Sequence, residues 1–350
     1  MEITDLDVPG YVRVARAVDE ESGLDALIAV HDTTLGPALG GMRRWVYASV
    51  DDAVKDVLRL AEGMTYKSAV ARTGLGGGKS VMIAKPKEPK SRELFRAMGR
   101  FIETFGGTYI TAEDVGTSVD DMVHVRDETR WVTGLPRELG GSGDPSPFTA
   151  RGTWLGIRCC LQRAFGSPDP KGRTVAVQGL GNVGMGVAKL LAKDGATIVA
   201  CDPKKDVQMV ARRLGATIVG LDEIYDVACD VFSPNALGAV VNDGTIPRIR
   251  APIIAGAANN QLAEARHADV LRDRGVLYAP DFVINAGGII NVSIEFAPGG
   301  YDEAASMERV ELIDDALQAV FDTAEEDGVS TLDAAMRVAK RRLEEARASG

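Results

Sequence analysis

Residues 174–202 read TVAVQGLGNVGMGVAKLLAKDGATIVACD, and this stretch decides the fold of the chain. Its first four residues are β-branched or apolar, which predicts a short buried strand over 174–178. Apolar residues at helical spacing over 183–193 predict a helix, and residues 197–200 predict a second strand. A strand, a helix and a second strand in this order form a βαβ unit, from which doubly wound sheets are built.

The turn between the first strand and the helix carries Gly179, Gly181 and Gly184 in the pattern G-x-G-x-x-G. In a dinucleotide site these glycines make the tight turn, let the backbone approach a pyrophosphate and let the helix pack on the strand. Glycines that serve tight packing alone are the alternative, but the complete βαβ context favours a dinucleotide. Asp202 ends the second strand, where it can accept hydrogen bonds from ribose hydroxyls. Its charge would repel a 2′-phosphate and so favours NAD over NADP, although two lysines that follow it weaken this preference.

The composition excludes several classes of protein. A length of 350 residues suggests about two domains. The 40 Lys and Arg residues against 50 Asp and Glu residues leave a formal charge of −10, which argues against binding to nucleic acid or to an anionic membrane surface. No apolar run approaches the ~18 residues of a membrane span. The acidic N-terminus does not resemble a signal peptide.

Cysteine and histidine usage indicates a reducing compartment and predicts no histidine-based metal site. The four cysteines form no C-x-x-C pair, so we expect buried free thiols in the cytoplasm. The three histidines lie far apart in the sequence, without an H-E-x-x-H motif.

Strands and helices alternate on both sides of a loop rich in Gly, Ser and Pro over residues 134–149, which predicts a domain boundary and a hinge there. The first domain is expected over residues 1–145 and the second over 146–328, with a last helix at about 329–350 packing back on the first domain. Helices are predicted from Ser49 onward and over 91–105, 150–165, 306–327 and 331–347. Strands are predicted over 11–16, 25–31, 80–84, 109–112, 216–219, 227–232, 252–256 and 276–279. The Gly- and Pro-containing residues 31–45 are interpreted as a loop.

Two lysines of the first domain stand out by their settings. Lys67 ends a helical segment, and Lys79 follows three consecutive glycines, which suggests close approach of another group to the backbone. The alternative for each is a solvated surface charge. The segment TGLGGGKS also resembles a phosphate-binding loop, but Thr73 stands where that motif needs glycine, and a strand rather than a helix follows.

Polar residues follow other predicted strands. Asp114 lies at the end of a strand, within AEDVGT, where side chains face a ligand crevice in open α/β sheets. An N-cap is the alternative for this aspartate. GAANNQL and NAGGIINV also follow strands, and their small residues would permit close approach to a nicotinamide ring. Asn259 and Asn260 offer amide hydrogen bonds there, although loop-capping asparagines look the same in sequence.

With these segments in place, the chain resembles the amino-acid dehydrogenase family that acts on glutamate, leucine, phenylalanine and valine, and within it the leucine branch. The resemblance runs from about residue 10 to past 340, through HDTTLGPALGGMR, GMTYK, LGGGKS, YITAEDVGT, GDPSPFTA, VQGLGNVG, GAANNQL and YAPDFVINAGGIINV. It implies an N-terminal α/β substrate domain, a Rossmann dinucleotide domain after it and a cleft between them.

The resemblance also implies roles for individual residues. Lys67 would pair with the substrate carboxylate, Lys79 would be the general base toward water, and Asp114 would handle the proton of the amino nitrogen. Asn260 would lie near the substrate and the nicotinamide. The side-chain pocket would include Leu39, Gly40, Gly41, Ala112, Ile289 and Val292. The cofactor contacts would be Arg43, Thr149, Gly179, Gly181, Asn182, Val183, Gly184, Asp202, Ala236, Ala258 and Asn259.

The implied activity is reversible, NAD-dependent oxidative deamination of an aliphatic branched-chain L-amino acid by a cytoplasmic homo-oligomer, with no nucleic-acid or membrane partner. Ala112 would shorten the pocket relative to the glycine of phenylalanine-specific members. Ile289, Met42 and the segment NVSIEF depart from the leucine pattern, so an aromatic substrate stays an alternative. A non-catalytic NAD-binding sensor or assembly subunit is a second alternative, disfavoured because both lysines and the aspartate are intact.

Overall fold

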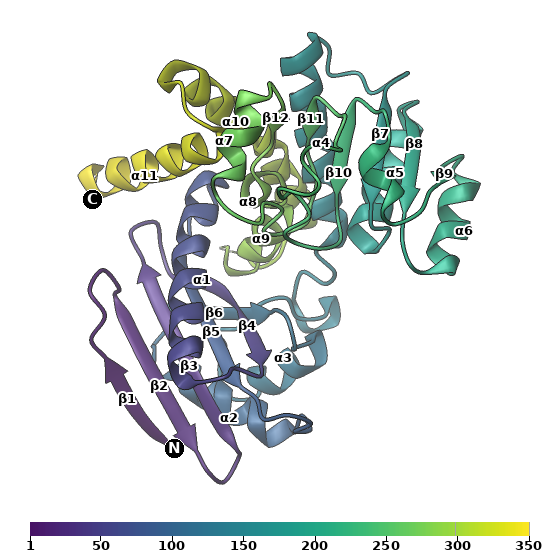
Figure 1. Cartoon of the computed structure of the whole chain (residues 1–350). Coiled ribbons are helices and arrows are strands. Elements are labelled where there is room, and N and C mark those ends of the chain that lie inside the picture. The colour runs from purple at the N-terminus through teal and green to yellow at the C-terminus, as the bar shows by residue number, and fades with distance from the viewer. Residues whose placement is uncertain (298, 350) are drawn as a thin grey trace. The chain divides into compact units, whose positions relative to one another are not determined.

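The computed structural model describes residues 1–297 and 299–349, and the chain divides into two compact units (Figure 1). The first unit comprises Met1–Asp144, Val292–Glu303 and Ala339–Gly350. The second comprises Pro145–Asn291 and Ala304–Val338. Residues 292–303, predicted as part of the nucleotide domain, fall in the first unit, and residues 329–338, predicted to pack back on the first domain, fall in the second.

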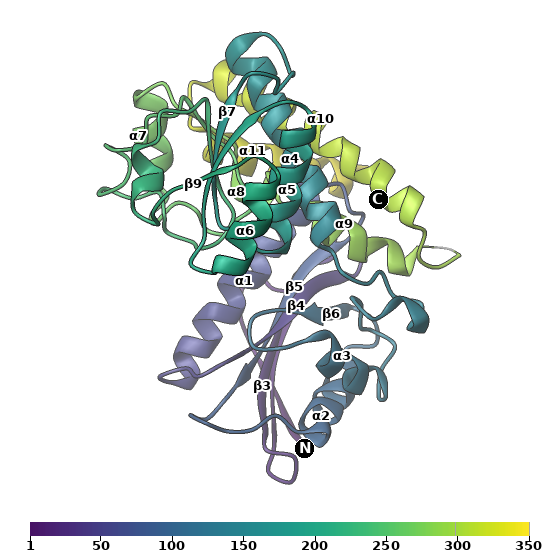
Figure 2. The ribbon, with the colours of Figure 1, turned by 90° about the vertical axis from the view of Figure 1, so that its right-hand side faces the viewer.

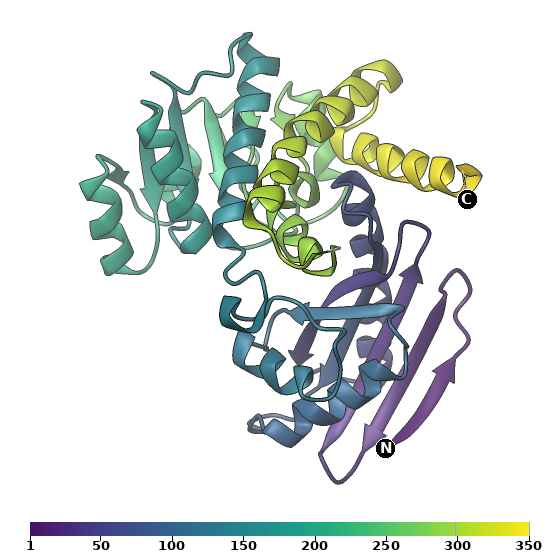
Figure 3. The ribbon, with the colours of Figure 1, turned by 180° about the vertical axis from the view of Figure 1, so that it is seen from behind.

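The first unit is built on a six-stranded sheet of order β1-β2-β3-β5-β4-β6. The three N-terminal strands and β5 pair antiparallel, whereas β5, β4 and β6 run parallel (Figure 3). The strands are β1 (Glu2–Leu6), β2 (Arg13–Asp19), β3 (Leu24–Asp32), β4 (Ala38–Trp45), β5 (Gly76–Ile83) and β6 (Tyr109–Glu113).

Two strands of this sheet are absent from the sequence predictions, and a third, β5, begins at Gly76 instead of residue 80. The loop predicted over 31–45 is wrong, because its second half forms β4 in the middle of the parallel part of the sheet. Gly40 and Gly41 indicated a loop, but here glycine serves close contact between neighbouring strands. The acidic N-terminus also forms an unpredicted edge strand, β1, whose side chains are mostly exposed.

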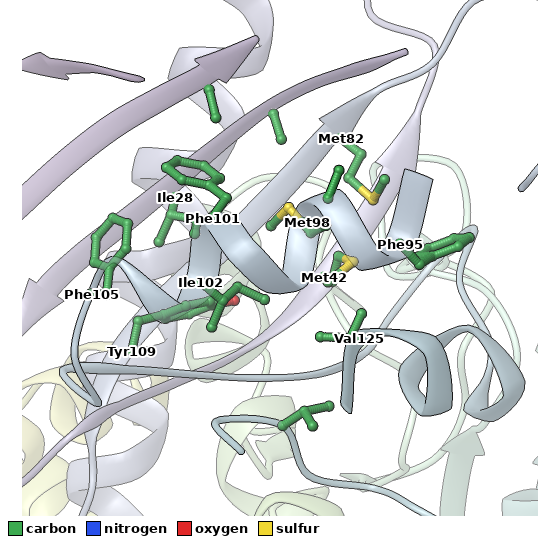
Figure 4. Packing of buried hydrophobic residues seen from close by; sticks show 14 of the residues in the cluster. Ile28, Met42, Met82, Phe95, Met98, Phe101, Ile102, Phe105, Tyr109 and Val125 are labelled. Carbon is green, nitrogen blue, oxygen red and sulfur yellow. The ribbon is translucent and has the colours of Figure 1, made fainter. Parts of the chain in front are cut away.

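Helices cover both faces of the first sheet. On one face lies α1 (Val50–Val70), which begins as predicted: the Ser49 hydroxyl accepts a hydrogen bond from the Asp52 amide at 3.1 Å. On the other face lie α2 (Arg92–Glu103) and α3 (Val119–Arg126). Figure 4 shows the core under these two helices, which includes Ile28, Met42, Met82, Phe95, Met98, Phe101, Ile102, Phe105, Tyr109 and Val125.

The second unit contains a six-stranded, fully parallel sheet of order β12-β11-β10-β7-β8-β9. Counted along this domain from β7, the order is 3-2-1-4-5-6, the doubly wound dinucleotide arrangement that the sequence predicted. The strands are β7 (Thr174–Gln178), β8 (Thr197–Cys201), β9 (Thr217–Ile218), β10 (Val231–Pro234), β11 (Ile253–Ile254) and β12 (Leu277–Tyr278).

Helices flank this second sheet as well: α4, α5 and α10 lie on one side and α7 on the other (Figure 2). Gly152 and Gly156 allow α4 to pack tightly, because a Cβ at either position would lie within 2.5 Å of an isoleucine side chain. The helices are α4 (Ser146–Phe165), α5 (Asn182–Lys193), α6 (Lys205–Arg213), α7 (His267–Asp273), α8 (Asp281–Ile284), α9 (Gly287–Ser293), α10 (Glu303–Asp327) and α11 (Thr331–Ser349). Among the described residues, no helix is both long and apolar enough to cross a bilayer.

Candidate active site

The parallel strands β5, β4 and β6 bring together the side chains singled out in the first unit. Because these strands run parallel and in register, Ser80 of β5 lies opposite Met42 of β4, and Met42 lies opposite Glu113 of β6, so that their neighbours Lys79 and Asp114 lie at the same level of the sheet. Lys79 lies on β5, and Asp114 follows the last residue of β6. The Lys79 Nζ atom donates a hydrogen bond to Asp114 Oδ2 at 2.7 Å, and Lys79 is only 5% exposed. Lys79 and Asp114, which the sequence singled out separately, therefore form a buried ion pair.

Glycines make this pair possible by letting the backbones around it approach closely. A Cβ at Gly40 would lie 1.7 Å from the carbonyl oxygen of Gly78, and one at Gly41 would lie 2.9 Å from the Asp114 Cβ. A Cβ at Gly77 would lie 2.1 Å from the Thr65 nitrogen of α1. The close approach predicted at the glycines before Lys79 is confirmed: the backbone of β5 lies against that of β4 on one side and against α1 on another.

Lys67 reaches this region through α1. It lies in the last helical turn, two residues beyond Thr65, and is half-buried. Because Gly77 lets this end of α1 rest against β5, Lys67 is carried on the element that packs directly on the Lys79 strand. Its predicted role toward a substrate carboxylate stays a prediction.

Arg43, predicted as a cofactor contact, lies within the same charge cluster. Its Nε donates to Asp114 Oδ2 at 3.2 Å, and its Nη1 donates to Asp56 Oδ2 at 2.9 Å. Asp56 also accepts hydrogen bonds from the Tyr47 hydroxyl at 2.8 Å and from Arg59 Nη2 at 2.9 Å. No sequence motif marks Asp56 or Tyr47; the available signal is a carboxylate beside the apolar stripe of α1.

The electrostatics of the pair follow from its burial. Burial lowers the pKa of Lys79, Asp114 opposes this effect, and Arg43 reinforces it. Burial alone would raise the pKa of Asp114, but Lys79 and Arg43 together hold it below its ordinary value. The aspartate is thereby kept ionised, while the lysine is moved toward the neutral form that a general base needs.

The alternative reading of Asp114 as a helix N-cap is not what the structure shows. Ser118 caps α3, through a complete capping box with Asp121. The Asp114 backbone amide donates to the Thr117 hydroxyl at 2.9 Å, so the turn after β6 is braced independently of the carboxylate.

The residues predicted for the side-chain pocket are spread over both units. Leu39 is buried on β4, and Ala112 of β6 lies opposite Gly41 in the sheet register. Val292 belongs to the first unit, where its carbonyl oxygen accepts a hydrogen bond from the Thr133 hydroxyl at 3.1 Å. Ile289 and Asn260 belong to the second unit, and Asn260 has the positive φ of 51° that asparagine tolerates in tight loops.

In the second unit, the predicted glycines form a turn that fits a dinucleotide. Gly179 has a φ of 92°, and a Cβ at Gly184 would lie 2.1 Å from the Gly179 carbonyl oxygen. Gly181 caps α5 without a side-chain hydrogen bond, and a Cβ there would meet no atom within 4 Å. There is thus open space at the Cβ position of Gly181, beside the first amides of α5, and the predicted phosphate contacts of Asn182 and Val183 stay a prediction.

Asp202 lies directly after β8, beside this turn. Its Oδ2 accepts a hydrogen bond from the Leu180 amide at 2.8 Å, and its Oδ1 accepts one from the Lys204 amide at 2.8 Å. These bonds fix the carboxylate, and each oxygen keeps a second lone pair that can accept a ribose hydroxyl.

The remaining predicted cofactor residues lie around the same sheet. Ala236 follows β10 and packs closely on Gly179: a Cβ added at Gly179 would lie 2.5 Å from the Ala236 Cβ. Ala258 is buried, and the side-chain oxygen of its neighbour Asn259 accepts a hydrogen bond from Asn285 Nδ2 at 2.7 Å. Thr149 lies in the first turn of α4, with its hydroxyl 3.0 Å from where a Cβ of Gly288 would be. The NAGG segment is therefore packed against the start of α4.

One histidine is found with two carboxylates, although no histidine-based metal site was expected. Asp243, Glu264 and His267 place their ligand atoms within 4.8 Å of one another. His267 Nδ1 accepts a hydrogen bond from the Glu264 amide at 3.0 Å, and Nε2 lies 3.2 Å from Asp243. Arg266 forms ion pairs with both carboxylates. The arrangement braces the loop before α7, with the cationic charge supplied by arginine.

Comparison with known proteins accounts for both units. Residues 10–131 match the family model described as Glu/Leu/Phe/Val dehydrogenase, dimerisation domain. Residues 140–210 and 204–350 match the model described as Glutamate/Leucine/Phenylalanine/Valine dehydrogenase.

Individual relatives agree along nearly the whole chain. A leucine dehydrogenase of Bacillus cereus is 49% identical over 334 residues, which cover 95% of this chain and 91% of that protein. A phenylalanine dehydrogenase of Lysinibacillus sphaericus is 45% identical, with 96% and 90% covered. The crystal structure of L-tryptophan dehydrogenase from Nostoc punctiforme matches with a TM-score of 0.88 at 42% identity, and 97% of each chain is covered. The chain therefore belongs to the glutamate/leucine/phenylalanine/valine dehydrogenase family of NAD(P)-dependent amino-acid dehydrogenases.

Proposed function

We propose that this protein catalyses the NAD-dependent oxidative deamination of an aliphatic branched-chain L-amino acid to the 2-oxo acid and ammonia, in a reversible reaction. The observation that carries the proposal is the buried Lys79–Asp114 pair, which lies on strands packed against the Lys67 end of α1. The similarity to leucine dehydrogenases at 49% identity supports the substrate class.

The residues of the first unit would perform the proton transfers. Lys67 binds the substrate carboxylate, and Asp114 accepts a proton from the amino nitrogen. A bound NAD would supply the hydride acceptor for the α-carbon, with its pyrophosphate held at the start of α5. The neutral amine of Lys79 then takes a proton from the water that attacks the imino carbon. Asp114 returns its proton to the nitrogen, the C–N bond breaks and the hydroxyl proton passes to solvent, so that ammonia leaves and the 2-oxo acid remains.

The residues of the second unit fit a dinucleotide. The amides at the start of α5 would hold the pyrophosphate, and Asp202 would accept the ribose hydroxyls. We infer NAD rather than NADP, since a 2′-phosphate would meet the fixed Asp202 carboxylate. Values of kcat/KM measured with both cofactors test this inference, and comparable values would contradict it.

NADH formation at alkaline pH with a panel of L-amino acids tests the activity. We expect leucine, valine and isoleucine to be turned over faster than phenylalanine and tryptophan, because Ala112 would shorten the side-chain pocket. Faster turnover of the aromatic amino acids would instead indicate an aromatic substrate, as the name of the L-tryptophan dehydrogenase from Nostoc punctiforme states for that protein. A purified protein that binds NADH but turns over no amino acid would indicate a non-catalytic sensor.

We also infer a cytoplasmic homo-oligomer that assembles through the first unit. The family model covering residues 10–131 is described as a dimerisation domain. The four cysteines are free thiols, and three of them are buried, as suits a reducing compartment.

A further inference from the structure

The carboxylate of Asp114 is shared between two cations. Both Lys79 Nζ and Arg43 Nε donate to the same oxygen, Oδ2, at 2.7 Å and 3.2 Å. A carboxylate oxygen that already accepts from a guanidinium binds an ammonium less strongly, because each donor withdraws part of its negative charge. The position and charge of Arg43 therefore affect how firmly Asp114 holds the proton on Lys79.

Arg43 is in turn held from the other side by Asp56, which α1 contributes to the cluster. Asp56 Oδ2 accepts from Arg43 Nη1 at 2.9 Å and from the Tyr47 hydroxyl at 2.8 Å, while Oδ1 accepts from Arg59. The side chains of Arg43 and Asp56 are 21% and 18% exposed, so solvent screens this ion pair less than a surface pair.

We propose that Asp56 is a positioning residue for the reaction: it holds Arg43 beside Asp114 and balances the guanidinium charge that competes with Lys79 for Asp114 Oδ2. The proposal rests on the proposed function, because it concerns the base of that reaction. Asp56 itself acts through Arg43 and is not assigned a contact with the substrate.

The sign of the effect follows from the charges that face each group. Lys79 is influenced by Asp114 after β6, by Arg43 of β4 and by Asp56 of α1. Arg43 faces the two carboxylates and the Tyr47 hydroxyl, and Glu113 of β6 lies near Asp114. Removing the negative charge of Asp56 leaves the guanidinium uncompensated, which favours neutral Lys79. Removing the guanidinium favours protonated Lys79.

The test is the pH dependence of kcat/KM for L-leucine with saturating NAD, in the parent and in three variants. Asp56→Asn should move the acidic limb of the profile to lower pH by about half to one unit. Arg43→Gln should move the limb to higher pH. Adding Asp56→Asn to Arg43→Gln should produce a smaller further shift, because only the direct influence of Asp56 on Lys79 then remains.

Asp51→Asn is the matched control, since it removes one carboxylate from an exposed position of the same helix and should leave the limb in place. A second measurement does not require turnover: the pH dependence of acetylation of Lys79 by acetic anhydride, followed by mass spectrometry of the Lys79 peptide. The same opposite shifts are expected there.

Equal shifts on Asp56→Asn in the parent and in the Arg43→Gln background would overturn the proposal. So would an Asp56→Asn protein that melts at lower temperature but keeps the parent's limb and acetylation profile, because Asp56 would then only tie α1 to β4. If the parent turned over no amino acid, the proposed function would fail, while the acetylation profile would still decide the role of Asp56.

Discussion

At the scale of single residues, the first unit places one partly buried carboxylate between a buried lysine and a partly buried arginine. Asp114 remains ionised because Lys79 and Arg43 both donate to it. Lys79 is pushed toward neutrality chiefly by its burial. Acid–base catalysis near neutral or alkaline pH requires two neighbouring groups whose environments shift their pKa values differently, so that one is ionised while the other can be neutral.

Replacing Lys79 by alanine tests the base directly. We expect Lys79→Ala to lower the rate of deamination by ~10²–10⁴-fold, which is the typical contribution of a general base. Binding of NADH, followed by its fluorescence, should stay close to that of the parent, because the dinucleotide turn lies in the second unit. A variant that melts normally and retains a third or more of the parental rate would rule out this role.

The glycines beside the pair should be far less tolerant of substitution than a solvent-facing glycine. Gly40→Ala would drive a Cβ to 1.7 Å from the Gly78 carbonyl oxygen, so the strands must separate. We expect a loss of about 1–3 kcal/mol or more in the free energy of unfolding, measured by urea denaturation.

Gly63→Ala is the matched control for this substitution. Gly63 is exposed in the middle of α1, and a Cβ there would meet no atom within 4 Å. Alanine at this position should stabilise the protein by about 0.5–1 kcal/mol, since glycine is the poorer helix former. Equal effects of the two substitutions would show that the close contact of β4 and β5 is not what requires glycine at position 40.

At the scale of elements, the end of α1 that carries Lys67 depends on the last helix of the chain. Arg342 of α11 donates from Nη1 to the carbonyl oxygens of Ala69 and Val70, at 3.1 Å and 2.5 Å. Carbonyl groups at a helix C-terminus have no partners within the helix, and a cation there also complements the helix dipole. The helix α11 thus stabilises the turn from which Lys67 projects.

Removing this cap should affect both stability and substrate binding. We expect Arg342→Ala to cost about 1.5–3 kcal/mol, the usual worth of a hydrogen bond to a charged group, and to raise KM for the amino acid more than it lowers kcat. Arg341→Ala, at an exposed position of the same helix, is the control and should change neither. Thermal unfolding and steady-state kinetics provide the two measurements. If the Arg342→Ala protein were less stable but had an unchanged KM, the cap would stabilise α1 without determining the position of Lys67.

At the scale of the whole molecule, the chain crosses between its two units several times, so that each unit contains residues distant in sequence. The first unit gathers Val292–Glu303 and Ala339–Gly350 around its N-terminal sheet. Glu295 from the first of these segments accepts hydrogen bonds from the amides of Gly134 and Ser142, at 2.9 Å and 2.8 Å. The segment predicted as a hinge is therefore anchored in part to the first unit.

Self-association can be measured on the intact chain. Light scattering at micromolar concentration should give a mass that is a multiple of the 37.1 kDa chain, because the first unit matches a dimerisation domain. A single species with the mass of one chain would contradict the inferred homo-oligomer. The exposed β1 edge is one place to probe, since unpaired edge strands can pair with other chains.

Local sequence determined the elements whose signals are contiguous. The β7–α5–β8 unit, the cap of α1 at Ser49 and the six strands of the second sheet follow from periodicity, glycine spacing and capping chemistry, which act over a few residues. Asp114 was expected at the end of a strand for the same reason. Only the tertiary structure showed that residues 38–45 form a strand inside the first sheet, because its glycines serve contacts with β5 from a distant part of the chain. Only the tertiary structure showed that Arg43 pairs with Asp114 and Asp56. These partners are 71 and 13 residues away in the sequence, and an ion pair between distant residues produces no periodic pattern.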